Sequence, residues 1–180
     1  MPEKKSENKA AKTSAHHHVA DDLRRVYEHL GRIDILEGAL AGVPFRQVSS
    51  LAALAEQQLV SGNPRDAADL LRIAEHICFA ALAPEHSLAN PPVSAELRAA
   101  IIDEMAKLAE RAEDYWSEVD APNETIASIY AATLEQSRKS FTSGVYRPAL
   151  ELARAVEALA EIAKRIPAEL PDASPVRLAS

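Results

Sequence analysis

A Ser-Gly turn followed by an Ala-rich helical segment occurs twice in this chain, and this repeat constrains the fold more than any other feature. The first copy runs from Ser61 to Ala83 and the second from Ser143 to Arg165, at a constant offset of 82 positions. The agreeing residues are Ser61, Gly62, Arg65, Ala67, Leu70, Arg72 and Glu75, matched by Ser143, Gly144, Arg147, Ala149, Leu152, Arg154 and Glu157. Apolar residues at steps of three and four indicate a helix with a buried side. Each copy follows another helix-like segment, so the sequence predicts two related helical hairpins.

The same spacing of apolar residues predicts six helices along the chain. The first is expected from Ala20 to about Leu40, and the second begins at Ser49 or Ser50 after a connector containing Pro44. The starts of the other four are predicted from capping residues and early prolines, namely Asn63 with Pro64, Ser94, Asn123, and Pro148 in the first turn of a helix that runs to about Ile166. No segment alternates apolar and polar residues for long enough to be a strand.

These helices predict an all-α fold, either a compact six-helix bundle or a short helical stack of antiparallel hairpins. A single helical domain is expected over residues 19–166. Residues 1–18 are rich in lysine and have little to bury, which predicts a disordered tail. Residues 167–180 carry three prolines and predict a second disordered tail.

The composition narrows the classes of function. Hydrophobic residues make up 47% of the chain, which is enough for a core, and the net charge is -7. An acidic chain repels phosphates, so binding of nucleic acid or of an anionic lipid surface is not expected. No apolar stretch is long enough to cross a membrane, and the N-terminus lacks the apolar core of a secretory signal. With Cys78 as the one cysteine, no intramolecular disulfide can form, and a cytoplasmic location is expected.

The turn and second helix of each hairpin resemble a tetratricopeptide repeat. In the first copy the pattern is carried by Gly62, Ala67, Leu71 and Ala74, and in the second by Gly144, Tyr146 and Ala149. The glycine ends one helix and the small alanine lets the next helix approach it closely. The chain departs from that family in its period, because 82 is not a multiple of roughly 34 residues.

A helix, a short Gly turn and an Ala-rich helix are also similar to the HEPN helical domains. That resemblance implies an RNase that uses an Arg and a His four to six residues apart. Arg24 and His29 meet this spacing, with His29 as general acid or base and Arg24 stabilising charge on the phosphate. They lie in the first predicted helix, where that family does not usually carry its motif. The other interpretation is two exposed residues on an amphipathic helix.

Further candidate sites are few. The triplet His16–His18 could hold a transition metal weakly, or belong to a solvated tail or an expression scar. His76 and Cys78 point about 200° apart on a helix and cannot chelate one ion, so no metal site and no cofactor are predicted. Tyr115 and Trp116 lie together near the end of the fourth helix, where they could anchor a partner or close the end of the bundle.

The sequence therefore predicts a non-enzymatic helical module for protein–protein interaction or scaffolding. Its partner would be another protein or, in a homo-oligomer, copies of the chain itself. The alternative is a HEPN-like RNase, or a toxin–antitoxin component that acts on RNA.

Overall fold

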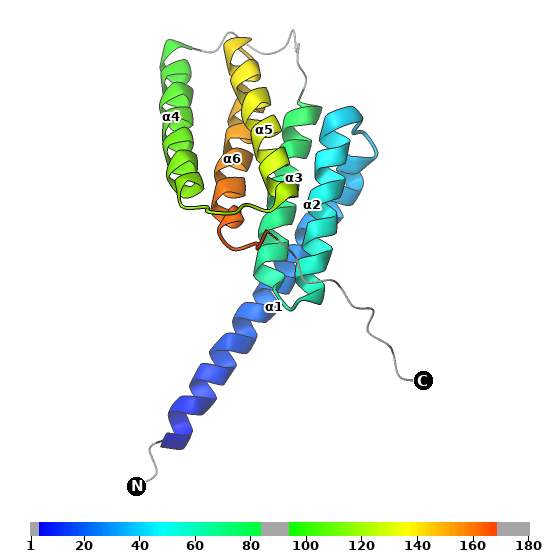
Figure 1. Cartoon of the computed structure of the whole chain (residues 1–180), viewed down its shortest axis with the longest axis vertical. Coiled ribbons are helices and arrows are strands. Elements are labelled where there is room, and N and C mark those ends of the chain that lie inside the picture. Colours follow the sequence, from blue (N-terminus) through cyan, green and yellow to red (C-terminus); the bar gives the residue numbers. More distant parts are fainter. Residues whose placement is uncertain (1–3, 84–93, 169–180) are drawn as a thin grey trace. The chain divides into compact units, whose positions relative to one another are not determined.

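The fold is all-α. The computed structural model describes residues 4–83 and 94–168, and within these ranges it contains six helices and no strand (Figure 1). The chain divides into two compact units, residues 1–78 and residues 79–180. We call them unit 1 and unit 2. The predicted single domain, 19–166, spans both units and stays a prediction. None of the helices in the described ranges is both long and apolar enough to cross a membrane.

Unit 1 contains α1 (Lys4–Glu37), α2 (Gly42–Val60) and most of α3 (Pro64–Leu82). Unit 2 contains α4 (Ala95–Ser117), α5 (Glu124–Thr142) and α6 (Tyr146–Ala163). In each unit a first helix is followed by a hairpin of two helices joined by a short turn. The predicted link after Pro84 falls in 84–93, outside the described residues, and most of the predicted C-terminal tail falls in 169–180, which is also outside them.

Two predicted helix starts are wrong. α1 begins at Lys4 rather than at Ala20. The segment between them is rich in Lys and Ala and contains no Gly or Pro, so its local preference is helical although it has little to bury. α1 ends at Glu37, just before Gly38. The predicted disorder of residues 1–18 stays a prediction.

The second wrong start is that of α2, which begins at Gly42 and includes the connector around Pro44. Pro44 lies in the first turn, where backbone N–H groups have no partner inside the helix, so its missing N–H costs little. The predicted caps Ser49 and Ser50 are therefore inside α2. By contrast, the predicted caps Ser94 and Asn123 are confirmed, since their side-chain oxygens accept backbone N–H bonds at the starts of α4 and α5.

The two Ser-Gly turns have the same geometry. Gly62 has φ +80° and Gly144 has φ +75°, the left-handed region that favours glycine. The N–H of Gly62 donates to the carbonyl of Leu59, and the next N–H donates to the carbonyl of Gln58. The equivalent bonds recur at Gly144, at the same offset of 82 positions. The predicted helix ends at the two Ser-Gly turns are confirmed, and each is a Schellman motif.

The second helix of each hairpin carries most of the core. The fully or nearly buried positions of α3 recur in α6, as pairs Ala67 and Ala149, Leu70 and Leu152, Leu71 and Ala153, Ala74 and Val156, Ile77 and Leu159, and Cys78 and Ala160. In unit 2 the first helix of the hairpin also buries Thr133 and Ser137. The Ser137 hydroxyl donates to the carbonyl of Ala149 at 2.9 Å, so this buried polar group is satisfied.

Candidate functional site

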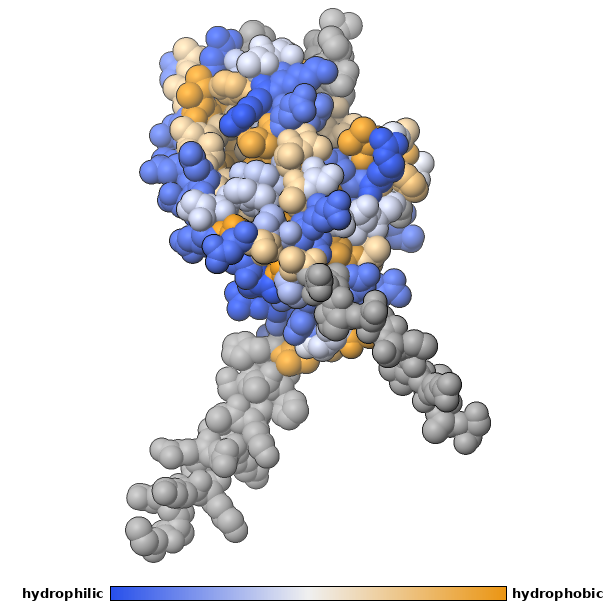
Figure 2. All heavy atoms as spheres, in the orientation of Figure 1, coloured by the Kyte–Doolittle hydropathy of each residue, from blue (hydrophilic) through white to orange (hydrophobic). Residues whose placement is uncertain are grey.

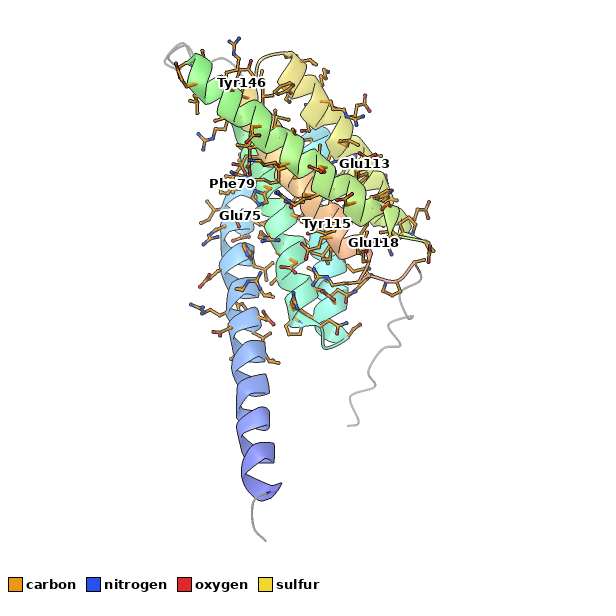
Figure 3. All side chains as sticks on the ribbon, turned by 90° about the vertical axis from the view of Figure 1, so that its left-hand side faces the viewer. Glu75, Phe79, Glu113, Tyr115, Glu118 and Tyr146 are labelled. Carbon is orange, nitrogen blue, oxygen red and sulfur yellow. The ribbon has the colours of Figure 1, made fainter. Side chains whose placement is uncertain are left out.

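A partly buried charge cluster, in which Arg32 is 53% exposed, joins α1 to α3 in unit 1. The Nδ1 atom of His29 lies 2.6 Å from a carboxylate oxygen of Glu75, and the Arg32 guanidinium donates to the same carboxylate at 3.2 Å and 3.3 Å. His29 and Arg32 are three residues apart on α1, so they share a side of that helix. The side chains of His29 and Glu75 are 12% and 9% exposed. We call these three residues the Glu75 cluster; Figure 3 labels Glu75 beside α1.

A second contact lies further along the same two helices. Arg25 donates to Asp69 of α3 at 3.0 Å and also to Asp22 one turn earlier on α1 at 3.2 Å. The apolar part of the α1 contact consists of Val26 and Ile33, both buried. α1 is thus held by a narrow apolar strip with ion pairs along it.

The Glu75 cluster has a simpler counterpart in unit 2. Glu157 of α6 stands at the repeat position of Glu75, and Arg111 of α4 pairs with it as Arg32 pairs with Glu75. The residue three positions before Arg111 is Leu108, which is buried, whereas the residue three before Arg32 is His29. The Arg–Glu pair is therefore common to both units, and the histidine is what unit 1 adds.

The chemistry available to this histidine follows from its partner. A carboxylate on Nδ1 fixes the orientation of the ring and leaves Nε2 as the other nitrogen, which is how general acid–base histidines are arranged. The same contact also serves to hold two helices together. Because Arg32 balances the charge of Glu75, the buried carboxylate is not isolated.

The structure does not bring Arg24 to His29. The Arg24 side chain is 69% exposed and lies 3.7 Å from Asp21 and 3.8 Å from Glu28, two neighbours on its own helix. His29 is instead joined to Glu75, which is not among the site residues predicted from the sequence. Glu75 does belong to the repeated set of residues, and that recurrence is the one signal in the sequence that points to it.

Tyr115 and Trp116 lie within the packing of unit 2. The Trp116 ring stacks on Tyr130 with centroids 4.0 Å apart, and both rings pack against the buried Ala160 and its neighbours. The Tyr115 ring lies 4.5 Å from the Lys164 ammonium, which also pairs with Glu118 (Figure 3). Burial raises the pKa of Tyr130 above its ordinary value. Tyr115 and Trp116 remain partly exposed.

The side of α1 that points away from α3 exposes large apolar residues. Leu23, Tyr27, Leu30 and Ile35 are 38%, 72%, 38% and 80% exposed. The view in Figure 2 shows a mostly hydrophilic surface with scattered hydrophobic residues, which is ordinary for a folded protein. Leu23, Tyr27 and Leu30 form one stripe of large apolar side chains, and Ile35 lies about 80° round the helix from Tyr27. We call this side, from Leu23 to Ile35, the α1 outer face.

The outer side of α4 can be compared with the α1 outer face, because Arg32 of α1 and Arg111 of α4 occupy equivalent positions and so align the two helices. On that alignment Leu23, Tyr27, Leu30 and Ile35 correspond to Ile102, Ala106, Ala109 and Asp114. Ile102 is 46% exposed, and the two alanines and the aspartate are exposed as well. The outer side of the first helix can thus be built from small or charged residues, so the fold does not require the apolar residues of α1.

Metal ligands are sparse in the described part of the chain. No three or more His, Cys, Asp or Glu side chains there are grouped so as to hold a metal ion. The His16–His18 triplet lies where side chains are not described. Comparison with known proteins finds no matching family model, no matching curated protein and no matching solved structure.

Proposed function

We propose that this chain is a helical protein-interaction module that docks a helix of its partner on the α1 outer face. The observation that carries the proposal is the exposure of Tyr27 and Ile35, at 72% and 80%, on a helix side that α4 fills with Ala106 and Asp114. Large apolar side chains are retained at a surface at an energetic cost, and a partner that covers them removes that cost.

The shape of the surface supports a helical partner. Leu23, Tyr27 and Leu30 recur at steps of four and three, the spacing by which one helix packs along another. Tyrosine at the centre of such a stripe is typical of residues that contribute most of the binding energy at interfaces. The ion pairs of α1 with Asp69 and Glu75 lie on the opposite side of that helix, so docking would leave them intact.

Site-specific photo-crosslinking tests this function. A photoreactive phenylalanine analogue is placed at position 27, and the matched control carries it at position 106, the exposed counterpart on α4. After irradiation in cells that produce the chain, position 27 is expected to give discrete heavier products that position 106 does not give. Equal patterns from both positions, or no product from position 27, would overturn the proposal.

A second candidate is cleavage of RNA at His29, favoured by one observation, the Glu75 carboxylate on Nδ1. In this candidate Nε2 of His29 exchanges a proton with the ribose hydroxyl or the leaving oxygen, and Arg32 rather than Arg24 stabilises the phosphate. The acidic charge of the chain opposes RNA binding, so we place this function second.

His29→Leu separates catalysis from packing, because it converts the cluster to the arrangement of Leu108 in unit 2. Labelled RNA is incubated with the wild type, His29→Leu and Arg24→Ala, and helicity is measured by circular dichroism. Cleavage lost only in folded His29→Leu would favour the nuclease. Cleavage that is absent in the wild type, or unchanged in the variant, would remove it.

A further inference from the structure

We propose that the partner on the α1 outer face is a second copy of this chain, docked antiparallel across a two-fold axis at the level of His29. The inference rests on the proposed function and specifies its partner. It depends only on residues of the α1 outer face. The side chains of α1 are described for residues 19–36.

The geometry of an α-helix identifies the residues that would meet. His29 points at Glu75 on α3, and successive residues turn by about 100°. The direction opposite His29 is therefore shared by Tyr27 and Gly31, with Arg24 and Asp34 about 40° to either side. All four residues are exposed.

The charges on this face are complementary to their own reversed copy. In an antiparallel pair centred at residue 29, Arg24 of each copy lies level with Asp34 of the other, which makes two attractive contacts. In a parallel pair the same residues would meet as Arg24 with Arg24 and Asp34 with Asp34, which is repulsive. Arg24 also lies 3.7 Å from Asp21 and 3.8 Å from Glu28 on its own helix, so Asp34 of the other copy would join these acidic groups around it.

The shape of the face is also complementary to its own reversed copy. In the antiparallel register Tyr27 lies level with Gly31 of the other copy, and this contact also occurs twice. A side chain added at Gly31 would meet nothing within 4 Å, so the space over this glycine is open. A large ring opposite a residue without a side chain allows two helices to approach closely. Leu23 and Ile35 are level with each other at the two ends of the contact.

A two-fold interface requires a surface that is its own complement. An unrelated partner would instead carry, on its own surface, the charges and the shape that match the α1 outer face. Here Arg24 with Asp34 and Tyr27 with Gly31 each find their complement on the same helix, at the mirrored position about residue 29, and this reciprocity selects a second copy over another protein.

Charge reversal tests the register. The variants are Arg24→Glu, Asp34→Arg and the double variant, and the control is Glu113→Arg, which reverses the counterpart of Asp34 on α4. Sedimentation equilibrium over a range of protein concentrations gives the dimer dissociation constant of each. We expect a dimer that each single reversal weakens by about tenfold or more, that the double variant restores, and that the control leaves unchanged.

Other outcomes overturn the inference in distinguishable ways. A dimer that the single reversals leave unchanged, or that the double variant does not restore, rules out this register. A wild type that stays monomeric at every concentration rules out the second copy. In that case the crosslinks from position 27 decide the proposed function independently. A crosslinked product with a different protein would support that function, and the absence of any product would rule it out.

Discussion

Unit 1 and unit 2 use the same hairpin and differ in what lies around it. The turns at Gly62 and Gly144 have the same hydrogen bonds, and α3 and α6 bury equivalent positions. Each first helix reaches the hairpin through an Arg–Glu pair, Arg32 with Glu75 and Arg111 with Glu157. Features found in both units are sufficient to explain the fold, so features found in one unit are the better guide to function.

The differences concern aromatic and ionisable side chains. Unit 2 packs Trp116 against Tyr130 and covers both in part, whereas unit 1 leaves Tyr27 72% exposed on α1. Unit 1 also replaces the leucine of unit 2, Leu108, by His29 in the Glu75 cluster. Neither difference is needed to form the hairpin. The chain can therefore serve as its own control, because a substitution in one unit has a matched substitution in the other.

Truncation of the paired core leucines should give the largest effect. Leu70→Ala and Leu152→Ala each remove a side chain that is at most 5% exposed, and each should lower the free energy of unfolding by about 2–5 kcal/mol. Urea denaturation followed by circular dichroism measures the loss. If the hairpins are equivalent, the two losses agree closely; a large loss at one leucine and almost none at the other would break the equivalence.

Neutralising the two equivalent glutamates should give unequal effects. Glu75 is 9% exposed and has two partners, whereas Glu157 is 24% exposed and pairs with Arg111. Glu75→Gln should lower the free energy of unfolding by about 1–3 kcal/mol, because His29 loses a charged acceptor at a nearly buried position and Arg32 loses its ion pair. Glu157→Gln should cost clearly less, since the Glu157 carboxylate is more exposed to the screening solvent than that of Glu75. An equal or larger loss at Glu157, measured by the same denaturation, would contradict the assigned difference.

The turn glycines should again behave alike. Gly62→Ala and Gly144→Ala force an L side chain into the left-handed region at a cost of about 1–2 kcal/mol each. Apart from the two neighbouring residues in the chain, no residue has an atom within 4 Å of the added carbon, so the cost is that of the backbone conformation. Asparagine tolerates this conformation better, and Gly62→Asn should therefore lose less stability than Gly62→Ala. If alanine and asparagine were equally costly in urea denaturation, contacts rather than backbone conformation would be responsible.

The sequence predicts those parts of the fold that are determined locally. A left-handed glycine, a capping Ser94 or Asn123 and an early Pro64 act on their own neighbours, so their roles can be inferred from a few residues. The start of α1 differs from the predicted one because helix propensity, and not only the apolar surface that a segment can bury, decides whether the segment is helical. The start of α2 differs because Pro44, which the sequence pattern marks as an interruption, is accepted in a first helical turn.

The candidate site could be predicted only in part. His29 was identified from its spacing to Arg24, yet its contact is with Glu75, which is 46 positions away. No spacing rule along one helix reports a contact between two helices. The α1 outer face was hidden for a similar reason, because Leu23, Tyr27 and Leu30 follow the helical spacing of a core, and only the packing decides which apolar side is covered. Ser137 shows the converse, a polar residue in the core because its hydroxyl reaches a carbonyl.

The smallest predicted effect is a pH dependence confined to unit 2. Burial raises the pKa of the Tyr130 hydroxyl, with the nearby Glu113 acting in the same direction and Arg138 opposing it. In the unfolded chain this pKa returns to about 10, so the folded state holds the proton more strongly. The resulting stability is complete below about pH 10 and is lost as the pH rises towards the folded pKa.

Tyr130→Phe removes this titration, and its stability should therefore fall less steeply above about pH 10 than that of the wild type. Trp116 is the one tryptophan of the chain and stacks on residue 130, so its fluorescence during urea denaturation reports on this part of unit 2. Tyr146→Phe is the control, because it keeps Tyr130 and hence the steeper fall. If stability fell equally steeply with alkaline pH in Tyr130→Phe and in the wild type, the partly covered Trp116–Tyr130 stack would not hold the tyrosine proton more strongly than the unfolded chain does. The contrast with the exposed Tyr27 of unit 1 would then concern packing alone.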